Sequence, residues 1–314
     1  MSRHTILGAG GVIADGLAKE LIGHQVVTRL VSRNPKPVGD AELFSADITD
    51  LQQTTEAVKN AEVVYLCIGL KYDYAVWRDR WPKIMNNTIE ACSRAQAKLI
   101  FFDNVYMYGR VQGPMDEETP FNPSSKKGDL RARIATELMS QVRKGNIVAS
   151  IARAADFYGP GTDKSGLPNI LVLANLAKKK KAQWLANASV KHSFTYVPDA
   201  VKALRILGQD QESWNQTWHL PTASNPPTGK EFVQLMAESM KTEPRLTVLA
   251  PWMVRLGGLF DKTVSELYEM LYQYQYEYLF DSSKFEKAFQ FSPTAYREGI
   301  RSSVELFVLR GAGS

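Results

Sequence analysis

The sequence has few of the residues on which a disulfide framework or a structural zinc site depends. Its 314 residues include two cysteines, Cys67 and Cys92, without C-x-x-C spacing, and four scattered histidines. We therefore expect neither disulfides nor a metal site. No apolar run approaches the ~20 residues that span a bilayer, and the first seven residues lack the order of a secretory signal. These absences predict a cytoplasmic protein without a membrane partner.

The sequence also lacks an extended basic region, although its formal net charge is +5. The one dense run of lysines is Lys178–Lys181, at the end of a predicted helix. Cations at a helix C-terminus complement the helix dipole and usually face solvent. We therefore expect a small-molecule substrate and no nucleic-acid partner.

Short apolar runs alternate with segments of helical pattern over the first two-thirds of the chain. The predicted strands are Thr5–Leu7, Gln25–Val31, Glu62–Ile68, Lys98–Phe102 and Ile147–Ile151. Alternating strands and helices are typical of a doubly wound parallel sheet with right-handed crossovers. The sequence therefore predicts an α/β, Rossmann-type fold.

The pattern loosens after about residue 160. We expect a hairpin within Gln183–Tyr196 and helices near Gly229–Met240 and Trp252–Tyr272. We predict a dinucleotide-binding domain over residues 1–160. Residues 161–314 would form a smaller C-terminal substrate lobe, interleaved with the last strands and helices of the sheet.

A glycine-rich turn joins the first predicted strand to the first helix. A dinucleotide site needs glycines where the turn is tight and where the backbone approaches the pyrophosphate, and it needs exposed N–H groups at the start of the helix. The small Ala14 then lets helix and strand pack. The residues assigned to the cofactor here are Gly8, Gly10, Gly11, Val12 and Ile13.

The end of the second strand indicates which dinucleotide binds. Sites for NAD usually place an acid about 20 residues after the turn, whereas an arginine there accommodates the 2′-phosphate of NADP. No acid lies between Glu20 and Asp40, and the strand ends in Ser32-Arg33. Arg33 can hold a phosphate with two hydrogen bonds. We therefore predict NADP as cofactor, with NAD as the alternative.

Several segments resemble, in order, the motifs of the extended short-chain dehydrogenase/reductase superfamily, specifically its NAD-dependent epimerase/dehydratase branch. They are GAGGVIA, SADITD, LCIG, NVYMYG, RAADFYGPG, HSFTYVPDAVKAL and FDSSKFEKAFQFSPT. The resemblance covers nearly the whole chain. It implies an oxidoreductase, epimerase or dehydratase acting on a small carbonyl, alcohol or sugar, and a homodimer through helices that flank the sheet.

The resemblance also implies further site residues. Asp47 and Ile48 would lie at the adenine, and Cys67, Ile68 and Gly69 along the ribose and pyrophosphate. Phe157 would contact the cofactor, and Tyr158 and His192 the substrate. Tyr72 and Tyr74 follow the fourth predicted strand, where they could line a substrate pocket or simply cover the core.

The chemistry that the resemblance implies meets a departure in this chain. Family members use a Tyr and a Lys four residues later on one helix, because residues i and i+4 share a face, together with a Ser or Thr on the fifth strand. Matching A-T-E to the family's A-x-E places Asp129 and Arg133 at the Tyr and Lys positions, and counting back from Gly109 places Asn104 at the Ser/Thr position. Arg133 could still bind the nicotinamide ribose, but Asn104 cannot supply a proton.

Candidates for a replacement acid follow from the neighbourhood. Tyr106 would share the strand face of Asn104, and Asp129 could act if buried beside Arg133. Lys126 or Lys127 could turn inward, although adjacent lysines are usually exposed. An enzyme with an altered acid is our first hypothesis, a non-catalytic NADP redox sensor the second, and an interaction scaffold that keeps only the fold the third.

Overall fold

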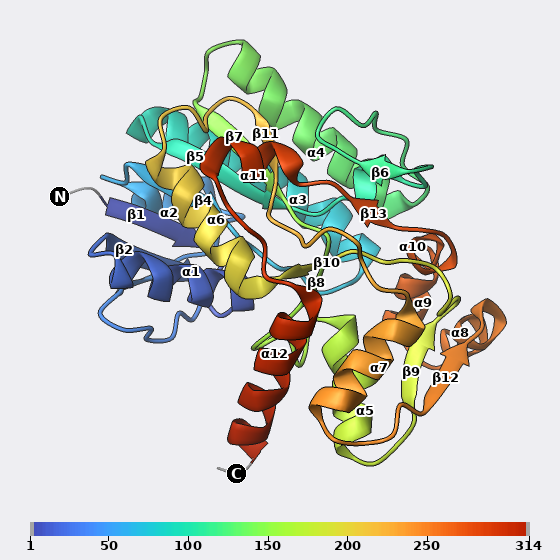
Figure 1. The fold of residues 1–314 in the computed structure, drawn as a ribbon. Coiled ribbons are helices and arrows are strands. Elements are labelled where there is room, and N and C mark those ends of the chain that lie inside the picture. Colours follow the sequence, from blue (N-terminus) through green and yellow to red (C-terminus); the bar gives the residue numbers. More distant parts are fainter. Residues whose placement is uncertain (1–2, 312–314) are drawn as a thin grey trace. The chain divides into compact units, whose positions relative to one another are not determined.

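The computed structural model describes residues 3–311 and divides into two compact units. The first contains the chain up to Met107, Lys126–Arg153 and Ala200–Trp218, and the second contains Tyr108–Ser125, Ala154–Asp199 and the chain from His219 on. Figure 1 gives the course of the chain. Each unit is discontinuous, so no single cut near residue 160 separates them.

A seven-stranded sheet forms the centre of the first unit, as the alternating pattern predicts. Its strands are β1 (Arg3–Leu7), β2 (Val27–Ser32), β3 (Glu42–Ser45), β4 (Val63–Leu66), β5 (Lys98–Asp103), β7 (Ala149–Arg153) and β11 (Thr217–His219). Their order in the sheet is β11-β7-β5-β4-β1-β2-β3. The pairs from β3 through to β7 are parallel. The strand order reverses direction at β1, which is where such sheets bind dinucleotides.

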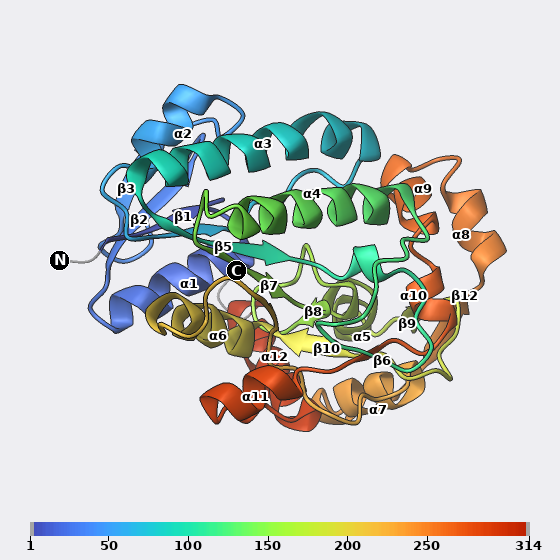
Figure 2. The ribbon, with the colours of Figure 1, turned by 90° about the horizontal axis from the view of Figure 1, so that it is seen from above.

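Helices cover both faces of this sheet. They are α1 (Val12–Gly23), α2 (Leu51–Val58), α3 (Tyr74–Ala95), α4 (Lys126–Arg143) and α6 (Val197–Gln209). Figure 2 shows α2, α3 and α4 on one face and α1 and α6 on the other. Strands buried on both faces need apolar residues at every position, and all four residues of β4 are buried. The α/β Rossmann-type prediction is confirmed.

The second unit is built from two-stranded ladders and short helices. The strands are β6 (Pro114–Met115), β8 (Asp156–Tyr158), β9 (Ala182–Leu185), β10 (Phe194–Tyr196), β12 (Leu246–Leu249) and β13 (Leu279–Phe280). The helices are α5 (Ala174–Ala177), α7 (Gly229–Ser239), α8 (Pro251–Gly257), α9 (Lys262–Tyr268), α10 (Tyr272–Gln275), α11 (Ser283–Phe289) and α12 (Tyr296–Gly311). Short turns at Tyr106–Tyr108 (η1) and Pro168–Leu173 (η2) complete the chain.

Two predictions for this unit are wrong. Gln183–Tyr196 is not a hairpin, because β9 pairs in parallel with β12 and β10 pairs in parallel with β8. The single helix expected over Trp252–Tyr272 is three helices, and Asp261 caps the second of them by accepting from Thr263 N and Val264 N. Pairing with the distant strands β12 and β8 takes the place of the expected hairpin, and the cap at Asp261 starts a new helix within the expected one.

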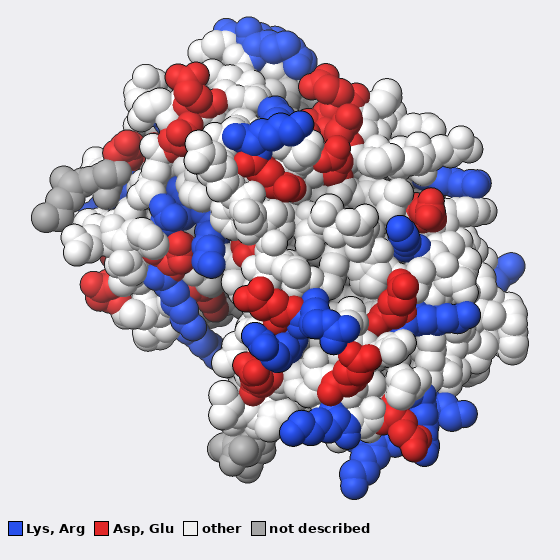
Figure 3. Space-filling view, viewed as in Figure 1, with Lys and Arg blue, Asp and Glu red and all other residues white. Residues whose placement is uncertain are grey.

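The surface carries mixed charge. On the face in Figure 3, basic and acidic side chains are interspersed. Lys178–Lys181 follow α5 and are exposed, as expected. Within residues 3–311, no cluster of metal-ligating side chains is found, and no helix is long and apolar enough to cross a membrane. Both cysteines are free thiols.

One buried titratable group sits in the centre of the sheet. His4 on β1 is buried, and its Nδ1 lies 3.0 Å from the hydroxyl of Tyr65 on β4. Desolvation lowers the pKa of His4 from 6.5 to about 4, although the charge of Glu62 opposes the shift. The native state therefore holds this imidazole neutral where the unfolded chain would protonate it.

This difference predicts a pH-dependent loss of stability. Below pH 6.5 the unfolded chain binds a proton that the native state accepts only near pH 4, so the native state is progressively disfavoured across this window. Between pH 7 and 4.5 we expect wild type to lose about 2–3 kcal/mol more than His4→Gln. Urea unfolding of both proteins at the two pH values measures it. Equal losses in the two proteins would contradict the assignment.

Candidate cofactor site and active site

The glycine turn lies between β1 and α1 with the backbone that a dinucleotide site requires. Gly8 and Gly10 have φ of +117° and +94°, values that side-chain-bearing residues rarely adopt. The N–H groups of Gly8 and Ala9 both donate to Val31 O on β2, at 2.9 and 3.0 Å. Gly11 is the N-cap of α1 and supplies no side chain there. The N–H of Gly10 donates to Asp15 Oδ1 at 2.8 Å, so the N–H groups at the start of α1 are the ones that an anion could meet.

The Gly8 position also depends on close approach between strands. A Cβ at Gly8 would lie 2.7 Å from the backbone oxygen of Cys67, at the end of β4. Cys67 itself is buried, and burial raises the pKa of its thiol. The cysteine is not among the residues that line the cavity, whereas its neighbours Ile68 and Gly69 are; its contact with the cofactor stays a prediction.

A cavity opens at the carboxyl ends of β1, β2 and β4, in the first unit. It is lined by Gly8, Ala9, Val31, Ser32, Arg33, Ala46, Asp47, Ile48, Thr49, Ile68, Gly69, Leu70, Arg80 and Ile84. Seven residues assigned from the sequence to the cofactor thus meet at one cavity. Gly10, Gly11, Val12 and Ile13 form the turn and the start of the helix beside it.

Asp47 is held ionised in this cavity. Its Oδ1 accepts from the backbone and hydroxyl of Thr49, at 3.0 and 2.8 Å. These hydrogen bonds lower the pKa of Asp47, and the charges of Arg33 and Arg80 lower it further. Arg33 and Arg80 therefore place two positive charges beside the single negative charge of Asp47 in this cavity. No sequence motif marks Arg80, which lies on α3 among other charged residues.

Helix α4 does not present the side chains expected from the resemblance. Asp129 and Arg133 form an i, i+4 ion pair with each other, and their side chains are 52% and 66% exposed. The burial beside Arg133 on which a role of Asp129 as acid depends is therefore not present, and the role of Arg133 at the nicotinamide ribose stays a prediction. An exposed pair of this kind contributes little to stability and is screened by solvent.

The same helix turns a different i, i+4 pair inward. Lys127 and Arg131 are 0% and 3% exposed. Lys127 Nζ lies 4.7 Å from the ring centroid of Tyr72, in the segment after β4. The expectation that adjacent lysines would both be exposed is therefore wrong for one of the two, since Lys126 is exposed and Lys127 is buried.

Arg131 is fixed by a carboxylate and by aromatic rings. Its Nε donates to Asp103 Oδ1 at 2.7 Å, and a second ion pair joins its Nη2 to the same oxygen. Its Cζ lies 4.3 Å from the ring centroid of Trp81. Asp103 ends β5 and is also 3.8 Å from Arg153 Nε. This guanidinium is therefore a buried anchor between α4 and the sheet.

The residues after β5 also differ from the prediction. β5 ends at Asp103, and Tyr106 begins the turn η1, so Tyr106 does not share a strand face with Asn104. Asn104 Oδ1 accepts from Tyr106 N at 3.1 Å, and the role of Asn104 at the substrate stays a prediction. The Tyr106 ring stacks on Trp77, with 9° between the planes.

Three residues assigned to cofactor or substrate lie in the second unit. Tyr158 is buried against Tyr196, Phe232 and Tyr296, so it packs the core of that unit, and its contact with a substrate stays a prediction. Phe157 precedes it on β8 and is partly exposed. Its role at the cofactor stays a prediction.

His192 is likewise a core residue. It is buried, and its ring stacks on those of Phe194, Tyr274 and Tyr278 at centroid distances of 4.3–4.4 Å. Its Nε2 lies 3.1 Å from Asp156 Oδ2. The packing gives His192 a structural role, and its contact with a substrate stays a prediction.

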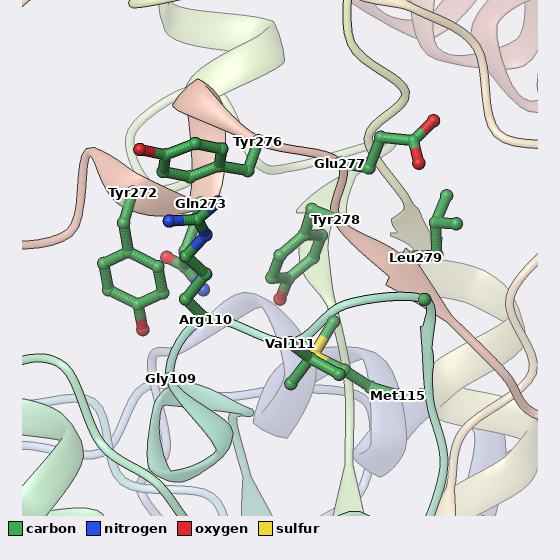
Figure 4. A pocket seen from close by; sticks show the side chains of 11 residues that line it. Gly109, Arg110, Val111, Met115, Tyr272, Gln273, Tyr276, Glu277, Tyr278 and Leu279 are labelled. Atoms are coloured by element: carbon green, nitrogen blue, oxygen red, sulfur yellow. The ribbon is translucent and has the colours of Figure 1, made fainter.

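A second, largely filled pocket lies within the second unit, beside the turn that follows η1. Figure 4 shows Arg110 reaching between Tyr272 and Tyr276. The Arg110 Cζ is 3.5 Å from the ring centroid of Tyr276. The guanidinium thus stacks on the ring and occupies the space between the two tyrosines.

Comparison with known families agrees with the geometry at the first cavity. A sequence profile described as the NAD dependent epimerase/dehydratase family matches residues 4–218. The chain belongs to the NAD dependent epimerase/dehydratase family. Curated protein sequences give no significant match.

Solved structures similar to this epimerase/dehydratase family member share its fold. The Thermus thermophilus UDP-glucose 4-epimerase, in complex with NAD, has a TM-score of 0.79 at 17% identity, with 99% of each chain covered. The Thermotoga maritima UDP-glucose 4-epimerase, with UDP-glucose, has a TM-score of 0.81 at 17% identity, covering 99% of this chain and all of that one. The dTDP-glucose 4,6-dehydratase of Bacillus anthracis, with NAD, has a TM-score of 0.82 at 14% identity, covering 99% and 98%.

Proposed function

We propose that this family member binds NADP(H) and uses it in hydride transfer to or from a small carbonyl, alcohol or sugar. The observation that supports this most directly is the pair of guanidinium groups, Arg33 and Arg80, at the cavity beside the glycine turn. A 2′-phosphate carries the charge that two such groups complement, and arginine binds it through paired hydrogen bonds.

The residues of the cavity fit the rest of a dinucleotide. The backbone N–H groups at the start of α1 would hold the pyrophosphate, because Gly11 at the N-cap has no side chain to occupy them. Ile48 and Asp47 would lie at the adenine, and Ile68 and Gly69 along the ribose. When bound, the nicotinamide supplies or accepts the hydride. The preference for NADP is a departure from the similar structures, two of which hold NAD.

The substrate class follows less directly. One similar structure holds UDP-glucose, and a nucleotide sugar is therefore one candidate within the proposed class. A non-catalytic NADP sensor is the second candidate function, because Asp129 and Arg133 face solvent and the chain has no Tyr–Lys pair at i, i+4. A sensor would bind both redox forms without turning over any carbonyl.

Titration calorimetry of the wild-type protein with NADPH and with NADH tests the cofactor proposal. We expect NADPH to bind at least about tenfold more tightly, because one added charge-assisted contact is worth about 1.5–3 kcal/mol. Equal affinities would leave NAD as the cofactor. Absence of binding by either nucleotide would overturn the proposal and leave the scaffold hypothesis.

A further inference from the structure

Exposed apolar side chains gather in the second unit, on the hairpin of α8 and α9 and on the strand that leads into it. The large ones are Val248, Trp252, Met253, Leu256, Leu259 and Phe260, and their exposure runs from 37% for Met253 to 92% for Phe260. Single exposed apolar residues need no explanation, whereas a group of them marks a surface that meets a partner or a membrane. Figure 1 draws α8 at the right-hand edge, and Figure 3 shows a largely uncharged surface there.

The apolar stripe of α8 faces away from the core. Trp252, Leu256 and Leu259 have the i, i+4, i+7 spacing of one helix face, and the hydrogen bond from Leu259 N to Leu256 O, at 3.1 Å, continues the turn beyond the end of α8. In a helix that packs only on its own protein, such a stripe is buried. Here Val254 is the residue of α8 that is buried, at 5% exposure. The stripe is therefore available to an external partner.

The hairpin is a firm support for this stripe. α8 packs on α9, and a Cβ at Gly258 would lie 2.9 Å from the Cα of Ser265. Leu259 and Phe260 at the turn between the helices are 76% and 92% exposed, so they form a projecting apolar tip. A flat protein surface would leave gaps around such a tip, whereas the lipid interface yields and takes up apolar side chains.

The charges around the stripe favour an anionic partner. Arg255 on α8 and Lys178–Lys181 after α5 are exposed, and the ion pairs within residues 3–311 involve none of them. The acid at the tip, Asp261, accepts two backbone hydrogen bonds at the start of α9. Glu266 and Glu269 on α9 are half-buried. The unpaired charge on this part of the surface is therefore positive.

The lysine run and the stripe lie at the two ends of one short ladder. Lys181 directly precedes Ala182, the first residue of β9, which pairs with Leu246 of β12. At the other end of the ladder, Leu249 leads through one residue into α8. Four residue pairs span roughly 13 Å. A single lipid surface over the stripe is therefore within reach of the long lysine side chains.

We propose that the α8–α9 hairpin docks this protein on an anionic lipid membrane. The stripe enters the boundary between headgroups and acyl chains, with Trp252 at the level of the headgroups. Arg255 and Lys178–Lys181 stay at the surface and bind lipid phosphates. The expectation of no membrane partner concerned spanning segments, and a helix that lies in the interface needs only one apolar face. This docking is independent of the proposed function.

Vesicle sedimentation of the full-length protein tests the proposal. We expect wild type to bind vesicles that contain phosphatidylglycerol at least about tenfold more tightly than vesicles of phosphatidylcholine alone, and added salt to weaken this binding. Leu259→Ser/Phe260→Ser should weaken it at least about tenfold, because both side chains leave water on docking. Replacement of Lys178–Lys181 by Gln should remove the preference for the anionic lipid.

Val308→Ser/Leu309→Ser is the matched control. These residues are 56% and 69% exposed on α12, in the same unit, and their replacement should leave vesicle binding unchanged. Wild type that fails to bind phosphatidylglycerol vesicles would overturn the proposal. An equal loss in this control and in Leu259→Ser/Phe260→Ser would also overturn it, because binding would then follow total apolar exposure and not the hairpin.

A second measurement reports insertion without a loss of binding. Trp252 is 64% exposed, whereas the other tryptophans are buried or half-buried. Vesicles with brominated acyl chains should therefore quench the emission of bound wild type but not that of bound Trp252→Phe. Equal quenching of the two proteins would contradict the insertion of the stripe. A dimer that Leu259→Ser/Phe260→Ser abolishes, in a protein that binds no vesicles, would assign the stripe to a second copy of the chain instead.

Discussion

Asp103→Asn is expected to lower the free energy of unfolding by about 3–5 kcal/mol, a large fraction of the stability of an ordinary domain. The substitution keeps the shape of the side chain and removes its charge. Asp103 and Arg131 are 2% and 3% exposed, and Arg153 nearby is 2% exposed. Without the carboxylate, the guanidinium of Arg131 would remain in a dry site facing a neutral amide, and an uncompensated buried charge is strongly unfavourable.

Helix α4 offers a matched control. Asp129→Asn removes the carboxylate of the other arginine pair, whose side chains are more than half exposed. We expect this variant to change stability by less than about 1 kcal/mol. Urea unfolding of the three proteins compares them directly. A loss of less than about 1 kcal/mol for Asp103→Asn as well would show that the buried pair is no more important than the exposed one.

The central sheet could be predicted because its signal is local. Strands such as VVYL are apolar at every position, and the glycine turn marks where the first strand passes into its helix. The second unit could not be predicted in the same way. β9 and β12 are four residues each and pair across more than sixty residues of chain, so neither periodicity nor turn residues reveal their partner.

The error on α4 has a geometric cause. Residues 127 and 131 and residues 129 and 133 both have the i, i+4 spacing, but a shift of two residues turns a side chain by roughly 200°. The choice between the pairs is therefore a choice between opposite faces of the helix. The apolar residues Leu130, Ile134 and Leu138 mark the buried face, and continuing their stripe backwards would have selected Lys127 and Arg131.

Arg80 illustrates a limit of motif-based prediction. The position of Arg33 follows from the length of one β-α-β unit, so the sequence places it at the cofactor. Arg80 reaches the same cavity from α3, a later helix that packs on the sheet from the side. Nothing in the WRDRW segment distinguishes Arg80 from Arg78, because which of them faces the cavity depends on how the helix docks.

The double variant Arg33→Ala/Arg80→Ala is expected to lower NADPH affinity by about 100-fold or more, with NADH affinity changed less than about threefold. Each guanidinium–phosphate contact is worth about 1.5–3 kcal/mol, and a factor of ten in affinity is about 1.4 kcal/mol. Each single variant should therefore lose at least about tenfold. NADH is the matched ligand, because it differs from NADPH only in the 2′-phosphate. Calorimetric titration of the four proteins with both nucleotides measures these effects.

Arg78→Ala is the matched protein control for this experiment. It removes the same charge from α3 at an exposed position outside the cavity, so any general electrostatic attraction of the nucleotide falls equally. If Arg80→Ala weakened NADPH no more than Arg78→Ala did, Arg80 would act only through net charge, and Arg33 alone would hold the phosphate. If the affinity for NADH fell as much as the affinity for NADPH, the two arginines would shape the cavity without binding the 2′-phosphate. That result would contradict the proposed preference for NADP. A selective loss of NADPH affinity in both single variants is therefore the result that assigns the two guanidinium groups to one phosphate.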